Sequence, residues 1–448
     1  MISVIAKAKV AKVASIKMSA LTTELKNRAL KAIAENIWRE REKILEANQR
    51  DLFAAKSLAA KGRYSEPFVR RLKLDKGKLR NIVDMISSVE ALEEPVGKTE
   101  YAIELDESLE LYRVTSPIGV IGVIFESRPD VLPQIAALCL KSGNATIMKG
   151  GSEAKNSIQG LYSVISEATK NTGVPEGWIQ LLHDRSEVRE LLKLDNFVDL
   201  IVPRGSNSFV KYIQSNTKIP VLGHSEGVCH IYVDVKADLK KAVEICYDSK
   251  VQYPSVCNAV DALLIHREIA ERFLPLVSDR YGKAGVEIRG CKESVKILKN
   301  RAKQATANDW GTEYLDLIVA IKIVDSLDEA IDYINAYSSH HTDAIVTEDF
   351  NAASRFVREV DSSSVICNAS TRFSDGYRYG LGAEVGISTG KIHARGPTGL
   401  EGLTIYKYYL IGSGQIVRDY VGTDSKKFTH RRLSKNWNDK MKEMSKRD

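Results

Sequence analysis

Short, almost continuous apolar runs alternate with helical segments along most of this chain, and this alternation restricts the fold more than any other feature. An apolar run of about four to eight residues is typical of a strand buried on both faces, which occurs mainly in parallel sheets covered by helices. We predict such strands at residues 118–125, 145–148, 178–182, 198–202, 219–222, 259–266, 317–324, 344–347 and 365–367. The pattern predicts an α/β fold with two doubly wound domains.

The 448 residues are too many for one ordinary core. Residues 20–56 have apolar side chains at helical spacing, and two stretches near 101–114 and 402–417 resemble edge strands. Because an edge strand needs a cover, these stretches predict a homo-oligomer, a dimer or a tetramer. We expect a first domain from residues 1–98 and 114–232, a second from 233–397, and oligomerisation strands at 99–113 and 398–420.

The net charge of +7 is concentrated in residues 421–448, which contain nine Lys/Arg and four Asp/Glu. We interpret this segment as a solvated basic C-terminal tail. Binding of nucleic acid or another polyanion is the alternative, but no aromatic ladder supports base stacking there. The other 420 residues are close to charge balance, which disfavours nucleic acid as a partner.

The remaining composition is that of a cytoplasmic globular protein. No apolar run approaches the ~20 residues that cross a bilayer, and the N-terminus lacks the apolar core of a signal peptide. The six cysteines form no C-x-x-C pair, which argues against a disulfide framework and a cysteine zinc site. His340 and His341 are interpreted as the start of a strand, so no metal is predicted.

Generic nucleotide-binding motifs are missing, since neither G-x-G-x-x-G after a strand nor G-x-x-x-x-G-K-[ST] occurs. A different signal comes from residues 372–402, which contain eight glycines. A glycine-dense stretch of this length inside a compact protein indicates a shaped, functional loop.

Four sequence blocks together resemble the aldehyde dehydrogenase superfamily. They are SPIGVIGVIFESRP at 116–129, MKGGSEA at 148–154, YPSVCN at 253–258 and NASTRFSDG at 368–376, the last running on through 380–388 and 392–397. The resemblance covers residues 10–418. It implies that the first domain binds a nicotinamide cofactor, that the second is catalytic, and that a small β element mediates oligomerisation.

By this resemblance, Cys257 is the catalytic nucleophile that carries an acyl group as a thioester. The preceding turn, residues 253–255, suits a thiol that must be exposed to backbone N–H groups. Ser127 stands near the position of the superfamily's oxyanion asparagine. Arg372 and Asp375, with Arg128, are candidates for the substrate's carboxylate and ammonium groups, although all three can equally be loop charges. The full predicted oxyanion and substrate set is Ser127, Arg128, Asn258, Asn368, Arg372 and Asp375.

The resemblance also implies a site for NADPH or NADP. Lys149 is expected on the cofactor ribose, and the start of the helix after residue 204 suits a pyrophosphate. Arg204 is expected to meet a 2′-phosphate, with a surface arginine as the alternative. The full predicted cofactor set is Lys149, Ser152, Glu153, Arg204, Gly205, Ser206 and Glu313.

One departure from the hydrolytic superfamily pattern decides the expected reaction. Hydrolytic members activate water with a glutamate, but the corresponding stretch here, residues 221–227, reads VLGHSEG. Glu226 does not align with that base, and an apolar or small residue near Leu222–Gly223 does. A site without a water-activating base protects a thioester from hydrolysis.

The blocks resemble most closely the branch that reduces L-glutamyl 5-phosphate to L-glutamate 5-semialdehyde with NADPH in proline biosynthesis. A glutamate 5-kinase is then a candidate partner, because acyl phosphates are short-lived. One alternative is an NAD(P)-dependent aldehyde dehydrogenase that hydrolyses its thioester or transfers it to CoA. Another is a nucleic-acid-binding or scaffold protein on an inactive enzyme fold.

Overall fold

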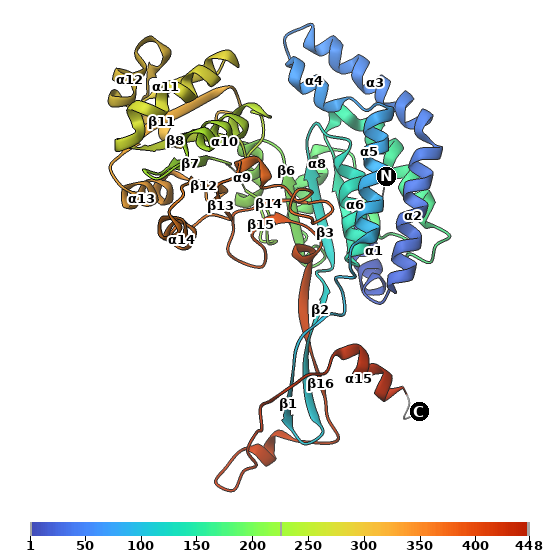
Figure 1. Cartoon of the computed structure of the whole chain (residues 1–448). Helices are drawn as coiled ribbons and strands as arrows, with labels where there is room; N and C mark the ends of the chain where they lie inside the picture. Colours follow the sequence, from blue (N-terminus) through green and yellow to red (C-terminus); the bar gives the residue numbers. More distant parts are fainter. Residues whose placement is uncertain (1, 225, 446–448) are drawn as a thin grey trace.

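The computed structural model describes residues 2–224 and 226–445. Two α/β lobes stand side by side, and a long β arm projects from them (Figure 1). The predicted α/β class with two doubly wound domains and a small β element is confirmed.

The first lobe is built on a four-stranded parallel sheet in the order β5-β4-β3-β6. Alternate residues of β3 enter different cores: Ile121, Val123 and Phe125 pack on one face of the sheet, and Val120 and Ile124 on the other. Burial of both faces explains why the strand reads as a continuous apolar run. The strands are β3 (Val120–Phe125), β4 (Ala145–Lys149), β5 (Ile179–Leu182) and β6 (Leu200–Arg204).

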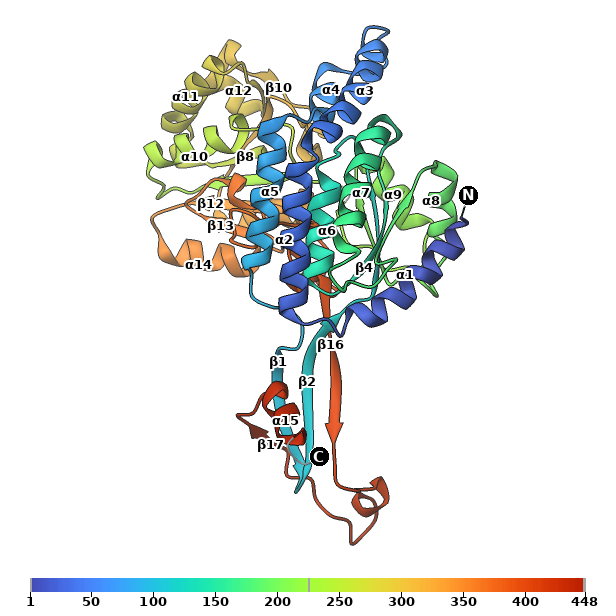
Figure 2. The same ribbon diagram turned by 90° about the vertical axis from the view of Figure 1, so that its right-hand side faces the viewer.

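Helices cover both faces of this sheet (Figure 2). The predicted helix over residues 20–56 is two helices, because the chain leaves helical geometry at Glu40. The helices are α1 (Val4–Met18), α2 (Thr23–Arg39), α3 (Arg41–Ala59), α4 (Glu66–Leu72), α5 (Lys76–Ala91), α6 (Val131–Lys141), α7 (Lys155–Thr169), α8 (Arg185–Leu191) and α9 (Asn207–Ser215), with the 3-10 turn η1 (Ser152–Ala154).

The second lobe contains a seven-stranded parallel sheet in the order β10-β9-β11-β8-β7-β12-β13. Its strands are β7 (Cys229–Val233), β8 (Val260–His266), β9 (Glu287–Gly290), β10 (Lys303–Gln304), β11 (Ile318–Val324), β12 (Thr342–Val346) and β13 (Ser364–Cys367). Its helices are α10 (Leu239–Val251), α11 (Arg267–Lys283), α12 (Lys292–Leu298), α13 (Leu327–Tyr337) and α14 (Phe350–Glu359), with 3-10 turns η2 (Lys299–Arg301), η3 (Ala307–Gly311) and η4 (Thr371–Phe373).

Two predicted domain boundaries are corrected by the packing. Strand β7 begins at Cys229, so the second domain starts before residue 233. Ala383 and Val385 belong to the core of the first lobe, so the chain returns there before residue 397. The glycine-dense segment forms the hairpin of β14 (Gly386–Ser388) and β15 (Gly396–Thr398), followed by η5 (Glu401–Leu403).

The arm is an antiparallel sheet in the order β16-β2-β1-β17. The predicted solvated tail is wrong in part, because residues 431–433 pair with β1 and a C-terminal helix packs on the sheet through Trp437 against Tyr112 and Tyr409. The elements are β1 (Thr99–Asp106), β2 (Leu109–Pro117), β16 (Thr404–Ile411), η6 (Val417–Tyr420), β17 (Arg431–Leu433) and α15 (Trp437–Met444). Among the described residues, no helix combines the length and apolar character needed to cross a membrane.

Candidate active site

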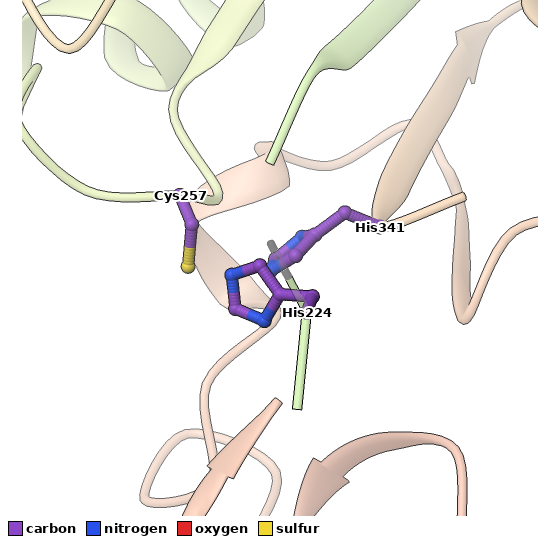
Figure 3. A group of neighbouring side chains, drawn as sticks. All are labelled: His224, Cys257 and His341. Atoms are coloured by element: carbon purple, nitrogen blue, oxygen red, sulfur yellow. The ribbon is translucent and has the colours of Figure 1, made fainter. Parts of the chain in front are cut away.

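Three side chains meet at one edge of the second sheet: His224, Cys257 and His341 (Figure 3). Each residue precedes the amino end of a different strand, β7, β8 and β12 in that order, and these strands are neighbours in the sheet. Because parallel strands start at the same edge, residues distant in sequence converge there. One side-chain atom of each, the sulfur or a ring nitrogen, lies within 4.8 Å of the others.

His224 is held in one orientation by the hairpin of the glycine-dense segment. Its Nδ1 lies 2.7 Å from the carbonyl oxygen of Ile387. Since a carbonyl can only accept, Nδ1 carries the proton and Nε2 of the neutral ring is an acceptor. In Figure 3 the other ring nitrogen is turned toward the Cys257 sulfur. Burial lowers the pKa of His224, which favours this neutral form.

His341 is fully buried beside the sulfur. Its Nδ1 lies 2.9 Å from Oγ1 of Thr342 and 3.8 Å from the sulfur of Cys229. Its Nε2 is buried and has no hydrogen-bond partner among the described residues. Its ring meets that of His224 edge-on, at 4.6 Å between centroids. A buried nitrogen without a partner is costly, which marks this position as more than a packing histidine.

The turn that holds Cys257 is packed against Gly227 and Cys229. A Cβ at Gly227 would lie 2.6 Å from the Cβ of Cys257, so only glycine fits there. The buried Cys229 thiol donates to the carbonyl of Cys257 at 3.1 Å. Burial raises the pKa of Cys229 and raises that of Cys139 to about 12, whereas Cys257 is half-buried and accessible. Its accessibility makes Cys257 the chemically available thiol of this cluster.

Arginine side chains also lie near Cys257. Arg204, at the end of β6, lies near Cys257 and Arg128, and its guanidinium is 3.5 Å from the carbonyl oxygen of Glu384. Burial lowers the pKa of Arg204 and raises that of the Glu384 carboxyl. These contacts place Arg204 near Cys257, and its role at a 2′-phosphate stays a prediction. Arg128 is exposed and pairs with Asp130 at 2.9 Å.

Arg372 is the best-placed residue of the predicted substrate set. It is buried, lies close enough to Cys257 for their charges to interact, and its Nε donates to the Gln252 amide oxygen at 2.9 Å. Burial lowers its pKa. Asp375 instead accepts from the backbone N–H groups of Tyr377 and Arg378, so its carboxylate is largely used in shaping its own loop.

Asn258 and Asn368 differ in their surroundings. The amide nitrogen of Asn258 donates to the Ser374 carbonyl at 2.7 Å, while its amide oxygen is buried without a partner among the described residues. Asn368 follows the carboxyl end of β13 and forms two hydrogen bonds with the Thr347 backbone. Asn368 therefore lies at the opposite edge of the sheet from Cys257, and its contact with substrate stays a prediction.

Apart from Glu313, the predicted cofactor residues lie at the carboxyl edge of the first sheet, where doubly wound sheets bind ligands. Lys149 ends β4 and is buried; burial lowers its pKa, and Glu153 is the largest opposing charge. Glu153 accepts from the backbone N–H of Ser127 at 2.7 Å and from its hydroxyl at 3.0 Å. A pocket beside Lys149 is lined by Gly150, Gly151, Ser152, Lys155, Ile158, Leu181, Leu182 and His183.

Two further contacts bear on the cofactor prediction. The backbone N–H of Ser206, at the start of α9, donates to the Glu126 carboxylate at 3.1 Å, so an acidic group already occupies this helix start. Gly205 lies against the same carboxylate, since a Cβ there would be 2.5 Å from Oε2 of Glu126. Glu313 in the second lobe accepts a hydrogen bond from the Asn207 amide of α9 at 3.1 Å, which places it beside this helix start.

Comparison with known proteins agrees with this geometry. The model of the aldehyde dehydrogenase family matches residues 3–297. The chain belongs to the aldehyde dehydrogenase family. It is 55% identical to a gamma-glutamyl phosphate reductase of Natronomonas pharaonis, over 96% of this chain and 98% of that protein. A gamma-glutamyl phosphate reductase of Methanosarcina barkeri is 54% identical, over 96% and 97%.

Solved structures give the same assignment within the aldehyde dehydrogenase family. The crystal structure of gamma-glutamyl phosphate reductase from Thermotoga maritima is 42% identical, with a TM-score of 0.89, over 92% of this chain and 99% of that one. The chain thus belongs to the gamma-glutamyl phosphate reductase branch of the family and is an oxidoreductase.

For a member of the aldehyde dehydrogenase family, the environment of Glu226 is informative. Its carboxylate pairs with the Lys211 ammonium on α9. This contact agrees with the sequence-based interpretation that Glu226 is not a water-activating base.

Three residues of this site were not predicted from the sequence as site residues: His224, His341 and Glu384. His224 and His341 each lie a few residues before a buried strand, as Cys257 does. That shared position is the one signal in the sequence that points to them, and it becomes specific only when the strand order is known.

Proposed function

We propose that the chain reduces L-glutamyl 5-phosphate to L-glutamate 5-semialdehyde and phosphate through a thioester on Cys257, with NADPH as the reductant, in proline biosynthesis. The observation that carries this proposal is the pairing of an accessible thiol with a neutral imidazole, Cys257 with His224, at a site whose neighbouring acid Glu226 is bound to Lys211.

In the first step, the Cys257 sulfur attacks the acyl carbon. Nε2 of His224 accepts the thiol proton, since Nδ1 is committed to the Ile387 carbonyl. The C–O bond to phosphate breaks, and a thioester remains on the sulfur. The backbone N–H of Cys257 is our candidate donor to the tetrahedral oxyanion, a type of contact typically worth about 3 kcal/mol.

Cationic side chains account for recognition of an acyl phosphate. Arg204 and Arg128 of the first lobe lie near each other and near Cys257, where they can hold the leaving phosphate. Arg372 approaches Cys257 from the second lobe and is our candidate for the α-carboxylate. Two separate groups of cationic side chains match a substrate that carries an anionic group at each end, whereas a simple aldehyde has no anionic group for them to bind.

The residues present fit a nicotinamide nucleotide. A buried cation, Lys149, stands beside a pocket with the small residues Gly150 and Gly151, and Glu313 reaches the start of α9 from the other lobe. Lys149 and Ser152 would hold the ribose, and Glu313 would hold the ribose next to the nicotinamide. When bound, NADPH would supply the hydride that converts the thioester to the aldehyde.

A kinetic assay in the reverse direction tests the proposal. Pyrroline-5-carboxylate, the cyclised product, is supplied with NADP, and NADPH formation is followed with and without inorganic phosphate. We expect turnover to require phosphate and to be lost in Cys257→Ser, while the matched control Cys291→Ser remains active. Turnover that needs no phosphate would contradict the proposal and favour a hydrolytic aldehyde dehydrogenase. Turnover that requires CoA would also contradict it and favour a CoA-acylating aldehyde dehydrogenase.

We also propose that the arm joins copies of this chain. Strand β16 is the longer of the two edge strands of the arm sheet, and it exposes Tyr406, Tyr408 and Leu410. An edge strand with exposed apolar side chains is a ready template for a second copy. Leu410→Lys should lower the molar mass measured by light scattering, and an unchanged mass would exclude this face.

A further inference from the structure

We propose that His224, Cys257 and His341 form a Zn²⁺ site that switches the enzyme off by binding its nucleophile. The metal-binding part of this inference stands on the geometry alone, and the inhibition rests on the proposed role of Cys257.

The ligand set is one that zinc prefers. Thiolate sulfur and imidazole nitrogen are its usual ligands, and bonds of about 2.0–2.3 Å place tetrahedral ligand atoms roughly 3.3–3.6 Å apart. The three ligand atoms here lie within 4.8 Å of one another. Small side-chain rotations therefore bring them to bonding distance without moving the three strands that carry them.

Both rings have the outer contacts that ligating histidines require. A histidine that binds metal through one nitrogen usually hydrogen-bonds through the other, which fixes the ring. Nδ1 of His224 donates to the Ile387 carbonyl, and Nδ1 of His341 lies 2.9 Å from Oγ1 of Thr342. These contacts leave Nε2 of each ring for a metal.

The surroundings of His341 support a metal site independently of the distances between the three ligand atoms. Its side chain is fully buried, and its Nε2 has no hydrogen-bond partner among the described residues. An aliphatic side chain would fill the same space without leaving a polar atom unpaired. No hydrogen bond within the site reaches Nε2 of His341 among the described residues, and a metal bond would supply the missing partner.

The binding step needs no oxidant or reductant. The S–H bond of Cys257 breaks, its proton passes to solvent, and the sulfur forms a bond to Zn²⁺, while each imidazole donates a lone pair. One proton is released for each zinc bound, and water completes the coordination. The sulfur lone pair that would attack the acyl carbon is then held by the metal.

Direct binding tests the site without any activity measurement. The full-length protein is freed of metal with a chelator and dialysed against Zn²⁺, and bound zinc is counted by elemental mass spectrometry. We expect one zinc per chain, and at least tenfold weaker binding in Cys257→Ser and in His341→Gln. Cys291→Ser serves as the control and should bind zinc normally. Equal binding by all four proteins would overturn the proposal.

Two readouts on the unmutated protein remain decisive where a variant fails to fold. Co²⁺ in place of Zn²⁺ should give the near-ultraviolet charge-transfer band of a thiolate ligand. Zinc should also slow alkylation of Cys257 by iodoacetamide at least tenfold, and chelator should restore it. No band at saturating Co²⁺, or alkylation indifferent to zinc, would exclude the site.

Activity separates this inference from the proposed function. Phosphate-dependent turnover of the metal-free enzyme tests the function alone, and its reversible loss with zinc tests the switch. Zinc binding without phosphate-dependent turnover would remove the proposed function and leave the site.

Discussion

Gly227 lies so close to Cys257 that a Cβ on it would come within 2.8 Å of the Cys257 Cα and 2.5 Å of the carbonyl oxygen. Both are backbone atoms of the turn that presents the thiol, so they cannot rotate away as a side chain would. The missing side chain at residue 227 thus sets the position of the nucleophile.

We therefore expect Gly227→Ala to lower kcat/KM by about 100-fold, the effect of a displacement near 1 Å. Overpacking should also lower the free energy of unfolding by about 1–3 kcal/mol. Steady-state kinetics and denaturant unfolding measure both effects. Gly282→Ala in α11, where a Cβ meets nothing within 4 Å, is the matched control and should be fully active.

His224→Gln should lower kcat by about 10²–10⁴-fold, the usual contribution of a general base. Because burial lowers the pKa of His224, its neutral form persists below the ordinary histidine range. Activity of the unmutated enzyme should fall only as pH drops below about 6.5, and this acid limb should vanish in the variant. An unchanged limb in His224→Gln would assign it to another group.

Lys149→Met should weaken NADP binding at least tenfold, about 1.4 kcal/mol, because a buried cation is lost while the side-chain volume is kept. Isothermal titration calorimetry measures this change. Alkylation of Cys257 should proceed at the normal rate in the same variant. Lys170→Met, an exposed position just after α7, is the control. Normal binding by Lys149→Met would place the cofactor elsewhere.

The lowered pKa of Glu110 indicates how docking of the C-terminal helix α15 depends on pH. Burial opposes its ionisation, but hydrogen bonds from Lys440, Tyr112 and Lys435 outweigh burial and lower the pKa of Glu110 to about 2. A lowered folded-state pKa means that this stabilisation is complete above pH 4.5 and is lost as pH falls toward 2. The protection of the amides of residues 437–444 against hydrogen exchange, measured relative to the intrinsic rate at each pH, should therefore fall below pH 4.5.

Glu110→Gln should show the faster exchange already at pH 7, because its amide cannot carry the charge that Lys440 and Lys435 neutralise. Glu107→Gln, an exposed neighbour in the same arm, should behave like the unmutated protein. If both variants exchanged alike, the carboxylate would have no part in docking α15.

Most of the buried strands could be predicted because their signal is local, although residues 219–222 form only an isolated bridge and β7 was not predicted. A strand buried on both faces must be apolar throughout, so β3 and β8 are visible as runs in the sequence. Cys257 was found by resemblance, and it stands at the start of β8 in the structure. The prediction of a solvated tail was wrong in part because Trp437, the apolar residue that anchors α15, is a single residue in a basic segment. Its packing against Tyr112 is visible only in the tertiary structure.

The partners of Cys257 were decided by tertiary structure alone. The strand order β8-β7-β12 is not sequential, and it makes three chain segments start side by side, so His224 and His341 meet the sulfur. The same sheet places Asn368, which follows β13, at the opposite edge. Local periodicity determines which residues form buried strands. Strand order and direction depend on packing between segments that are distant in the sequence, and this packing cannot be inferred from any one segment.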